Sequence, residues 1–248
     1  MVIKQSLKRV ILFLIPKSIK AQLGKAVYSE IKVFSAPEFI NLSYSQEGED
    51  LILGRIFEGR YTGFYIDVGA HHPMRFSNTY KFYLLGWRGI NIDALPDSMK
   101  KFKQARPDDI NIEVPISKDT SSKLTYYMFN EPALNTFDKS LADSRNNGKP
   151  YKITEERIMQ TYTLAEILKM HMAHGQKIDF LSIDVEGLDV EVLESNDWEL
   201  YRPAYIVTEC FDTSLSEVRK ADVNGILESK GYSLFAKTVN SLIYKNEV

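Results

Sequence analysis

The 248-residue sequence predicts an α/β fold with a mostly parallel sheet that finishes in an antiparallel hairpin. Short runs that are apolar almost throughout alternate with helical patterns, as expected for parallel strands covered on both faces. Near the C-terminus, two strand-like runs are separated by only a few residues, a spacing that permits a hairpin rather than a crossover helix. The expected strands are 64–68, 89–94, 110–116, 178–185, 204–209, 232–237 and 241–246.

Helical patterns lie between these strands. The first falls within residues 45–60, where apolar residues recur near helical spacing and acidic residues occupy the first turn. The remaining helices are expected at 76–85, 97–105, 163–174, 188–195 and 214–230. This alternation of strand and helix predicts right-handed crossover connections.

The connection at about 118–177 is much longer than a crossover requires. Long connections above a site tend to be lids or substrate loops, so we expect a lid or substrate insertion here. Four aromatic residues of the insertion could stack on a sugar face, or could form a minor core. They are Tyr126, Tyr127, Phe129 and Phe137.

Composition favours one globular domain, which we expect at 43–248. Hydrophobic residues make up 44% of the chain and the formal net charge is −2. This balance argues against nucleic acid as a partner, because proteins that bind nucleic acid usually present a basic face to the phosphates. The single cysteine, Cys210, excludes an intrachain disulfide and suits a reducing compartment such as the cytoplasm.

Residues 1–42 read as a basic amphipathic N-terminal segment. Its apolar run, VILFLIP at 10–16, has seven residues, whereas a membrane-spanning helix needs about 20. Residues 1–27 therefore suggest peripheral contact with an anionic membrane surface, for which the inner membrane is the expected place. Packing against the main domain or against a second copy in a homo-oligomer explains the same pattern.

Acidic residues end the first two expected strands. Asp67 and Asp93 stand about 25 residues apart, a spacing at which the second acid accepts hydrogen bonds from the hydroxyls of a ribose. Gly69 allows the backbone to approach a ligand closely. A diphosphate, however, requires a glycine-rich loop at a helix N-terminus, and here the loop contains His71 and His72. The loop therefore fits a nucleoside without a phosphate better than a dinucleotide.

Several motifs in order resemble the FkbM-type S-adenosylmethionine-dependent methyltransferases. They are SQEGED at 45–50, GFYIDVGAHHP at 63–73, SNT at 77–79, GWRGINIDALP at 86–96, IDFLSIDVEGLDVEVL at 178–193 and RPAYIVTE at 202–209. The resemblance implies a Rossmann-like seven-stranded methyltransferase sheet and methyl transfer from S-adenosylmethionine to a hydroxyl. The family often has Asn and Gly where the histidine pair and Pro73 stand, and commonly Glu where Asp93 stands.

The resemblance also implies where the cofactor would bind. The turn from Asp67 to Gly69 would cradle its amino-acid and ribose portions, and Asp93 would hold the ribose hydroxyls. The other cofactor-binding candidates are Gln46, Ser77, Asn78 and Ser117. Each polar candidate has a structural alternative, because acids, asparagines and serines also cap helices and form turns.

Methyl transfer to a hydroxyl requires a base near the acceptor oxygen. Asp184 ends the fourth strand, Glu186 follows it, and Glu209 ends the fifth. Carboxylates on neighbouring strand ends repel one another, which raises a pKa toward that of a useful base or attracts a divalent cation. His72 is a further candidate, both as the base and, with Asp184 and Glu209, as a metal ligand. The structural alternative is that Asp184 caps the helix near Leu188 and Glu209 pairs with a lysine or arginine.

The sequence therefore predicts an O-methyltransferase that acts on a hydroxyl of a sugar, glycan, glycolipid precursor or related natural product. Two other classes remain open. A non-catalytic cofactor-binding subunit of a membrane-associated glycan assembly system would retain the same pocket. A nicotinamide dehydrogenase would share the sheet and the ribose acid, but it needs the glycine-rich turn that is missing here.

Overall fold

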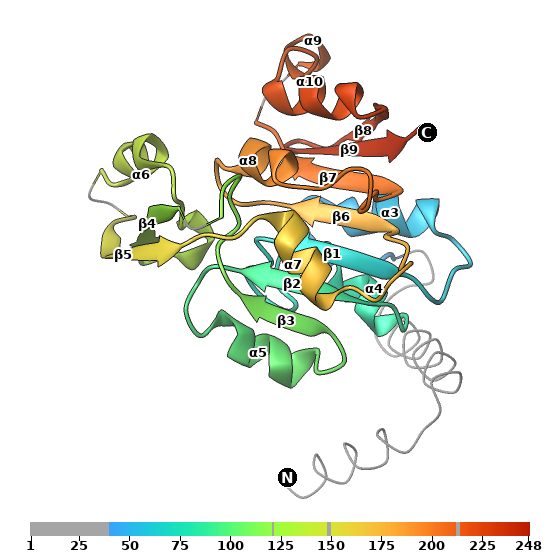
Figure 1. The fold of residues 1–248 in the computed structure, drawn as a ribbon, viewed down its shortest axis with the longest axis horizontal. Helices are drawn as coiled ribbons and strands as arrows, with labels where there is room; N and C mark the ends of the chain where they lie inside the picture. The colour runs from blue at the N-terminus through green and yellow to red at the C-terminus, as the bar shows by residue number, and fades with distance from the viewer. Residues whose placement is uncertain (1–39, 121, 148–149, 212–213) are drawn as a thin grey trace, which may run out of the picture.

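The computed structural model describes residues 40–120, 122–147, 150–211 and 214–248, and its main element is a seven-stranded sheet (Figure 1). The strand order is β3-β2-β1-β6-β7-β9-β8, and every pair is parallel except those made by β9. The strands are β1 (Phe64–Val68), β2 (Arg88–Asp93), β3 (Ile110–Glu113), β6 (Phe180–Ile183), β7 (Tyr205–Glu209), β8 (Tyr232–Lys237) and β9 (Ser241–Asn246). The predicted Rossmann-like sheet with an antiparallel C-terminal hairpin is confirmed.

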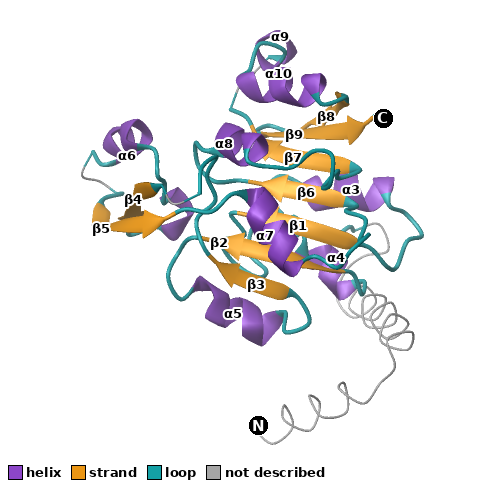
Figure 2. Ribbon diagram, in the orientation of Figure 1, coloured by secondary structure: helices purple, strands orange, loops and turns teal. Residues whose placement is uncertain are grey.

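Helices cover both faces of this sheet (Figure 2). They are α3 (Glu49–Ile56), α4 (Tyr80–Leu84), α5 (Ser98–Ala105), α7 (Leu164–His171), α8 (Asp189–Glu194), α9 (Leu215–Val218) and α10 (Asp222–Ser229). Successive residues of β1 point to opposite faces, so Ile66 joins a core with α7, α8 and α10, whereas Tyr65 joins a core with α3 and α4. Asp67 shares the face of Tyr65, an arrangement that matters for the site below.

The C-terminal helical pattern was predicted as one helix at 214–230, but the structure contains two. α9 begins with a capping box between Ser214 and Glu217 and ends after one turn. Ala221 then has an extended backbone, with φ −63° and ψ 140°, before α10 starts. The apolar spacing continued through this break, which is why the pattern alone suggested a single helix.

The connection at 118–177 contains a small unit beyond the carboxyl ends of the parallel strands (Figure 1). Its antiparallel strands β4 (Lys123–Phe129) and β5 (Ile153–Gln160) enclose a short 3-10 helix, η1 (Pro132–Leu134), and α6 (Lys139–Arg145). The same range also includes α7, which packs on the main sheet. The inserted unit is thus β4 to β5, and its position brings it to the edge where a ligand is expected.

The basic N-terminal segment predicted at 1–42 lies almost wholly outside the described residues, which begin at 40. The membrane contact expected of residues 1–27 therefore has no structural description. Within the part of the chain that is described, no helix has both the length and the apolar character required to cross a bilayer.

Candidate active site

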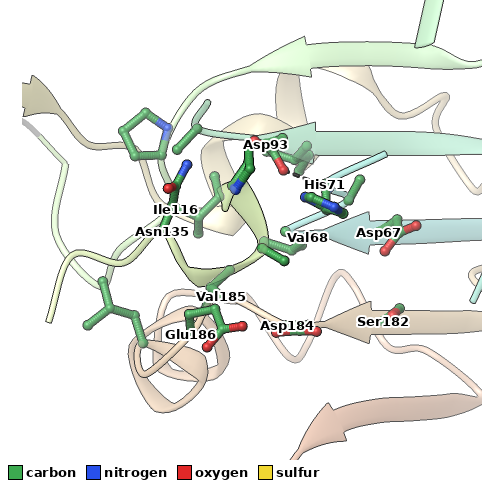
Figure 3. A pocket seen from close by; sticks show the side chains of 18 of the residues that line it. Asp67, Val68, His71, Asp93, Ile116, Asn135, Ser182, Asp184, Val185 and Glu186 are labelled. Carbon is green, nitrogen blue, oxygen red and sulfur yellow. Dashed lines mark hydrogen bonds between the residues drawn. The ribbon is translucent and has the colours of Figure 1, made fainter. Parts of the chain in front are cut away.

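A cleft opens where the strand order reverses, at the carboxyl ends of β1 and β6 (Figure 3). Open parallel sheets bind ligands at this switch point. The cleft contains about 970 Å³ of space, part of which is open to solvent. Its walls bring together the predicted residues Asp67, Gly69, Asp93 and Asp184.

Gly69 is required by a close approach between two loops. Its φ is 81°, and a Cβ atom placed on it would lie 1.7 Å from the backbone oxygen of Asp184. No side chain fits at that separation, and positive φ is itself unfavourable for other residues. The Gly69 amide also donates to the Ile92 carbonyl at 2.9 Å. Glycine therefore lets the loops after β1 and β6 meet at the base of the cleft.

Asp67 is buried in the wall of the cleft, with 5% of its surface exposed. Its Oδ2 accepts a hydrogen bond from the Thr79 hydroxyl at 2.7 Å, and the Ser182 hydroxyl also donates to the carboxylate. Burial raises the pKa of Asp67, while these hydroxyls and the charge of Arg106 oppose the shift. The described hydrogen-bond donors to Asp67 are side-chain hydroxyls rather than the first amides of a helix. Asp67 therefore does not act as the helix cap considered as its structural alternative.

Asp93 ends β2 and accepts two backbone hydrogen bonds. Oδ2 accepts from the His71 amide and Oδ1 from the Leu95 amide, each at 2.7 Å. Burial, opposed by these two bonds, raises the pKa of Asp93 to about 6. The carboxylate is therefore mainly ionised at neutral pH. Each oxygen keeps further acceptor capacity for a ligand hydroxyl.

The structure distinguishes the two adjacent histidines. His71 lines the cleft with a φ of 50°, and its buried Nε2 has no hydrogen-bond partner among the described residues. His72 does not line the cleft; its Nδ1 accepts from the amides of Met74 and Arg75 at 3.2 and 3.0 Å. Burial lowers the pKa of both imidazoles. The sequence could not select His71, because the choice depends on its left-handed backbone.

The other cofactor-binding candidates also divide into residues that line the cleft and residues that do not. Gln46 and Asn78 line the cleft, and Asn78 Nδ2 donates to the Ser182 hydroxyl at 3.0 Å. Ser77 and Ser117 are buried but do not line it. The Ser77 hydroxyl accepts from the Tyr80 amide at 3.0 Å, which is the capping alternative noted from the sequence.

The inserted unit contributes one wall of the cleft. Tyr126 and Phe137 line it, with their ring centroids 4.4 Å apart in a stacked arrangement, and Asn135 lies beside them. The apolar segment Val114 to Ile116 forms part of the same cleft. These residues suit a flat apolar group such as a nucleobase. Sequence reasoning assigned the aromatic residues to a sugar or a minor core and did not identify the apolar segment.

Three carboxylates meet at the ends of β6 and β7. One oxygen from each of Asp184, Glu186 and Glu209 lies within 4.8 Å of the other two. Glu186 forms an ion pair with Arg145 of α6 at 2.6 Å. Within the described ranges, Asp184 and Glu209 have no such partner, so the structural alternative in which Glu209 pairs with a lysine or arginine is not seen. α8 begins at Asp189 without a side-chain cap, so Asp184 does not cap it.

Burial and mutual repulsion act together on this carboxylate cluster. Asp184 lines both cavities and is exposed there, although it lies deep in the molecule. Burial is the largest cause that raises its pKa well above the usual value, and the negative charges of Glu186 and Asp189 add to the shift. Burial and then the charge of Asp184 likewise raise the pKa of Glu209. A proton taken up here is therefore held more tightly than by an ordinary carboxylate.

A second, smaller cavity adjoins the first and shares Gln46, Asn78 and Asp184 with it. It contains about 380 Å³ of space, again partly open to solvent. Glu209 and Asn240 line it, and no residue of the inserted unit that the structure describes does. The turn between β8 and β9 is held there by Glu47, whose carboxylate accepts from Thr238 Oγ1, Asn240 N and Asn240 Nδ2 at 2.7–2.8 Å.

The larger cleft fits a nucleoside cofactor such as S-adenosylmethionine. Asp93 offers acceptors for a ribose diol, the apolar wall suits an adenine, and the unpaired His71 Nε2 points to a missing polar partner. No glycine-rich loop is present for a diphosphate. This sheet and this cleft are those expected of an S-adenosylmethionine-dependent methyltransferase. More particularly, the chain belongs to the FkbM methyltransferase domain family, whose model matches residues 67–234.

Several solved structures are similar in overall chain arrangement. A precorrin-6y C5,15-methyltransferase from Geobacter metallireducens is 10% identical with a TM-score of 0.44, covering 87% of this chain and 94% of that one. A TehB-like SAM-dependent methyltransferase from Corynebacterium glutamicum is 11% identical (TM-score 0.39; 93% and 100% covered). An O-methyltransferase from Bacillus cereus in complex with SAH is 14% identical (TM-score 0.38; 98% and 96% covered). Comparison with curated protein sequences gives no match.

Proposed function

We propose that the protein transfers a methyl group from S-adenosylmethionine to a hydroxyl oxygen of a sugar, glycan or glycolipid precursor. One observation carries the choice of acceptor atom: Asp184 and Glu209, which have no cationic partner among the described residues, lie at the wall of the second cavity. A carboxylate without a partner at this position is available to take a proton from a hydroxyl.

In this proposal the cofactor occupies the larger cleft. Asp93 binds the ribose hydroxyls, and Asp67 and the loop at Gly69 lie beside the ribose and amino-acid portions. Bound there, the cofactor supplies an electrophilic methyl group on a sulfonium. The methyl group would then face the smaller cavity, where the acceptor enters, at the boundary that Asn78 and Asp184 line in both cavities.

The protein's own task is to orient the acceptor and remove its proton. The acceptor oxygen forms a bond to the methyl carbon while the carbon–sulfur bond breaks, and its proton passes to Asp184 or Glu209. Because the pKa values of both groups are raised, the pair holds one shared proton, and the charge that remains on the pair accepts the proton of the acceptor hydroxyl. Glu186 contributes negative charge but remains paired with Arg145.

A divalent cation is the alternative form of the same proposal. Carboxylate oxygens are the ligands that Mg²⁺ and Mn²⁺ prefer, and the three acids converge closely enough to share one ion. The cation would neutralise the cluster and lower the pKa of a bound hydroxyl. Incubation with EDTA separates the two forms, because only the metal-dependent reaction should be lost and then recover when Mg²⁺ or Mn²⁺ is added.

The main experiment combines binding with turnover. Calorimetry should detect binding of S-adenosylmethionine and S-adenosylhomocysteine but not NAD, and labelled methyl transfer should be measured on a panel of glycosides and lipid-linked glycans. Asp184→Asn should lower the rate by roughly 10² or more, as for a lost general base, with unchanged S-adenosylhomocysteine affinity. Glu113→Gln is the matched control, since Glu113 also ends a strand of the sheet but lies outside both cavities.

Each other outcome identifies a different function. NAD binding would favour a dehydrogenase. Cofactor binding without transfer to any acceptor would favour the non-catalytic subunit. Near-full turnover in both Asp184→Asn and Glu209→Gln would exclude these two carboxylates as the base, and the remaining candidates, His72 and Glu186, would be replaced in turn.

The acceptor's location extends the proposal. A cytoplasmic enzyme held at the inner membrane surface by the basic residues 1–27 would have lipid-linked glycans within reach. Support comes from sequence alone, through the lysines and arginine that flank the apolar run. A homo-oligomer that buries the same segment is the competing proposal, and sedimentation with and without vesicles distinguishes them.

A further inference from the structure

Two oppositely charged side chains are wholly buried behind the cofactor cleft. The side chains of Arg106, which follows α5, and Asp109 are both 0% exposed, and Arg106 Nε lies 2.9 Å from Asp109 Oδ2. Burying such a pair is expensive, because both ions lose their hydration. Neither residue lines either of the two cavities described above. The free-energy cost of burying this ion pair therefore indicates a role beyond packing.

One nitrogen of Arg106 connects this pair to the cleft. Nη2 donates to the Tyr65 hydroxyl at 2.8 Å and to Thr79 Oγ1 at 3.0 Å. The Tyr65 hydroxyl donates in turn to Asp109 at 2.7 Å, so this branch closes on the ion pair itself. The Thr79 hydroxyl donates to Asp67 Oδ2 at 2.7 Å, so only this branch reaches the cleft.

Elementary chemistry fixes the direction of the Thr79 branch. A guanidinium group only donates hydrogen bonds, so Thr79 Oγ1 must accept from Arg106. The hydroxyl has one hydrogen, and the short bond to Asp67 uses it. The Ser77 hydroxyl, 3.2 Å from Thr79 Oγ1, can then donate to the remaining lone pair. Every partner of Thr79 is thereby satisfied with Asp67 as the acceptor.

We propose that Arg106 and Thr79 are positioning residues that hold the Asp67 carboxylate in one orientation for a ligand in the cleft. This inference rests on the proposed function, in which Asp67 contacts the cofactor. Thr79 draws Oδ2 inward and the Ser182 hydroxyl also donates to the carboxylate. The remaining acceptor capacity faces the cleft, where it can receive donor groups of the ribose or amino-acid portion.

The test compares two hydroxyls bonded to the same Arg106 nitrogen. Thr79→Val keeps the shape of the side chain but removes the bond to Asp67, and it should weaken S-adenosylhomocysteine binding about tenfold or more in calorimetry. Thr79→Ser should restore most of the affinity. Tyr65→Phe removes the buried hydrogen bonds to Arg106 and Asp109 without touching Asp67, so it should lower thermal stability while affinity stays within about twofold.

A double-variant cycle separates positioning from general loss of structure. If Thr79 acts through Asp67, Asp67→Asn combined with Thr79→Val should bind no more weakly than Asp67→Asn alone. Equal affinities for Thr79→Val and Tyr65→Phe, or additive effects in the cycle, would overturn the inference.

A measurement on the unliganded wild-type protein makes the test independent of the proposed function and of variant folding. Nuclear magnetic resonance should show a slowly exchanging Thr79 hydroxyl proton coupled to the Asp67 carboxyl carbon. If the wild-type protein does not bind S-adenosylhomocysteine but shows this proton, the proposed function fails and the positioning contact stands. A rapidly exchanging Thr79 hydroxyl would reject the positioning contact whatever the ligand.

Discussion

Replacement of Asp93 by asparagine tests the cofactor site most directly. The carboxylate accepts 2.7 Å hydrogen bonds from the His71 and Leu95 amides and is proposed to accept two more from a ribose. An asparagine has only one acceptor oxygen, and its NH₂ group would face either an amide or a ribose hydroxyl. The charged acceptor and at least one ligand bond are therefore lost together.

The expected loss follows from these contacts. Hydrogen bonds to a charged group contribute about 1.5–3 kcal/mol, so the Kd for S-adenosylhomocysteine should rise about 10- to 150-fold. The ionised form binds the donors, and burial raises the pKa of Asp93 to about 6. Wild-type affinity should thus fall as the pH decreases through 6, because protons then compete with the ligand, and the variant should show a flatter dependence.

Calorimetry at pH 5, 6 and 7 is the assay. Asp97→Asn provides a matched control, because Asp97 is an exposed acid in the same connection whose contact is an exposed ion pair with Lys100. The melting temperature of Asp93→Asn should change little, since the neutral side chain also avoids the cost of burying a charge. Unchanged affinity at pH 7, with both variants folded, would show that Asp93 does not hold the ligand.

Three further predictions concern a strained glycine, an ion pair of the inserted unit and the N-terminal segment. Gly69→Ala should lower the unfolding free energy by about 2 kcal/mol or more, because a positive φ and a backbone clash coincide at this position. In the same denaturation assay, Gly225→Ala should stabilise the protein by about 0.5–1 kcal/mol, because Gly225 lies in a helix with open space around it. Arg145→Ala should cost about 1–3 kcal/mol by breaking the partly buried ion pair of the inserted unit, and clearly more than Lys139→Ala, whose ion pair in the same helix is exposed; equal costs would contradict this. Deletion of residues 1–27 should abolish low-salt co-sedimentation with anionic vesicles, and undiminished binding would place membrane contact elsewhere.

Much of the fold was predictable because it depends on local patterns. The apolar strands and the short spacing before β9 follow from residue order alone, and they specify the parallel sheet and its antiparallel end. Gly69, Asp93 and Asp184 were found because acids and glycines at strand ends converge at one edge of such a sheet. The break at Ala221 was missed, since apolar periodicity continues across it.

What escaped prediction depends on three-dimensional arrangement. The inserted unit was expected to be a lid or substrate insertion, but the sequence did not show that two of its aromatic residues, Tyr126 and Phe137, line the larger cleft and that Asn240 of the C-terminal turn lines the smaller one. His71 rather than its neighbour faces the cleft because of a positive φ that no spacing reveals. Arg106 carries no sequence signal either, because a single arginine after a helix normally indicates a solvated end.

The general-base and metal forms of the proposal have a common physical origin. Asp184 and Glu209 have pKa values raised by burial and by neighbouring carboxylates, so their ionised forms destabilise the folded state at pH values above the pKa that these groups have in the unfolded chain. This destabilisation of the folded state is relieved as the pH falls and the pair takes up a proton. The pH dependence of stability is therefore opposite to that of an ordinary salt-bridged acid. Either a proton shared between the two carboxylates or a bound cation removes the same repulsion. A proton taken from an acceptor hydroxyl at this site therefore neutralises part of the negative charge of the two carboxylates. Metal dependence decides only whether a bound cation has already neutralised that charge.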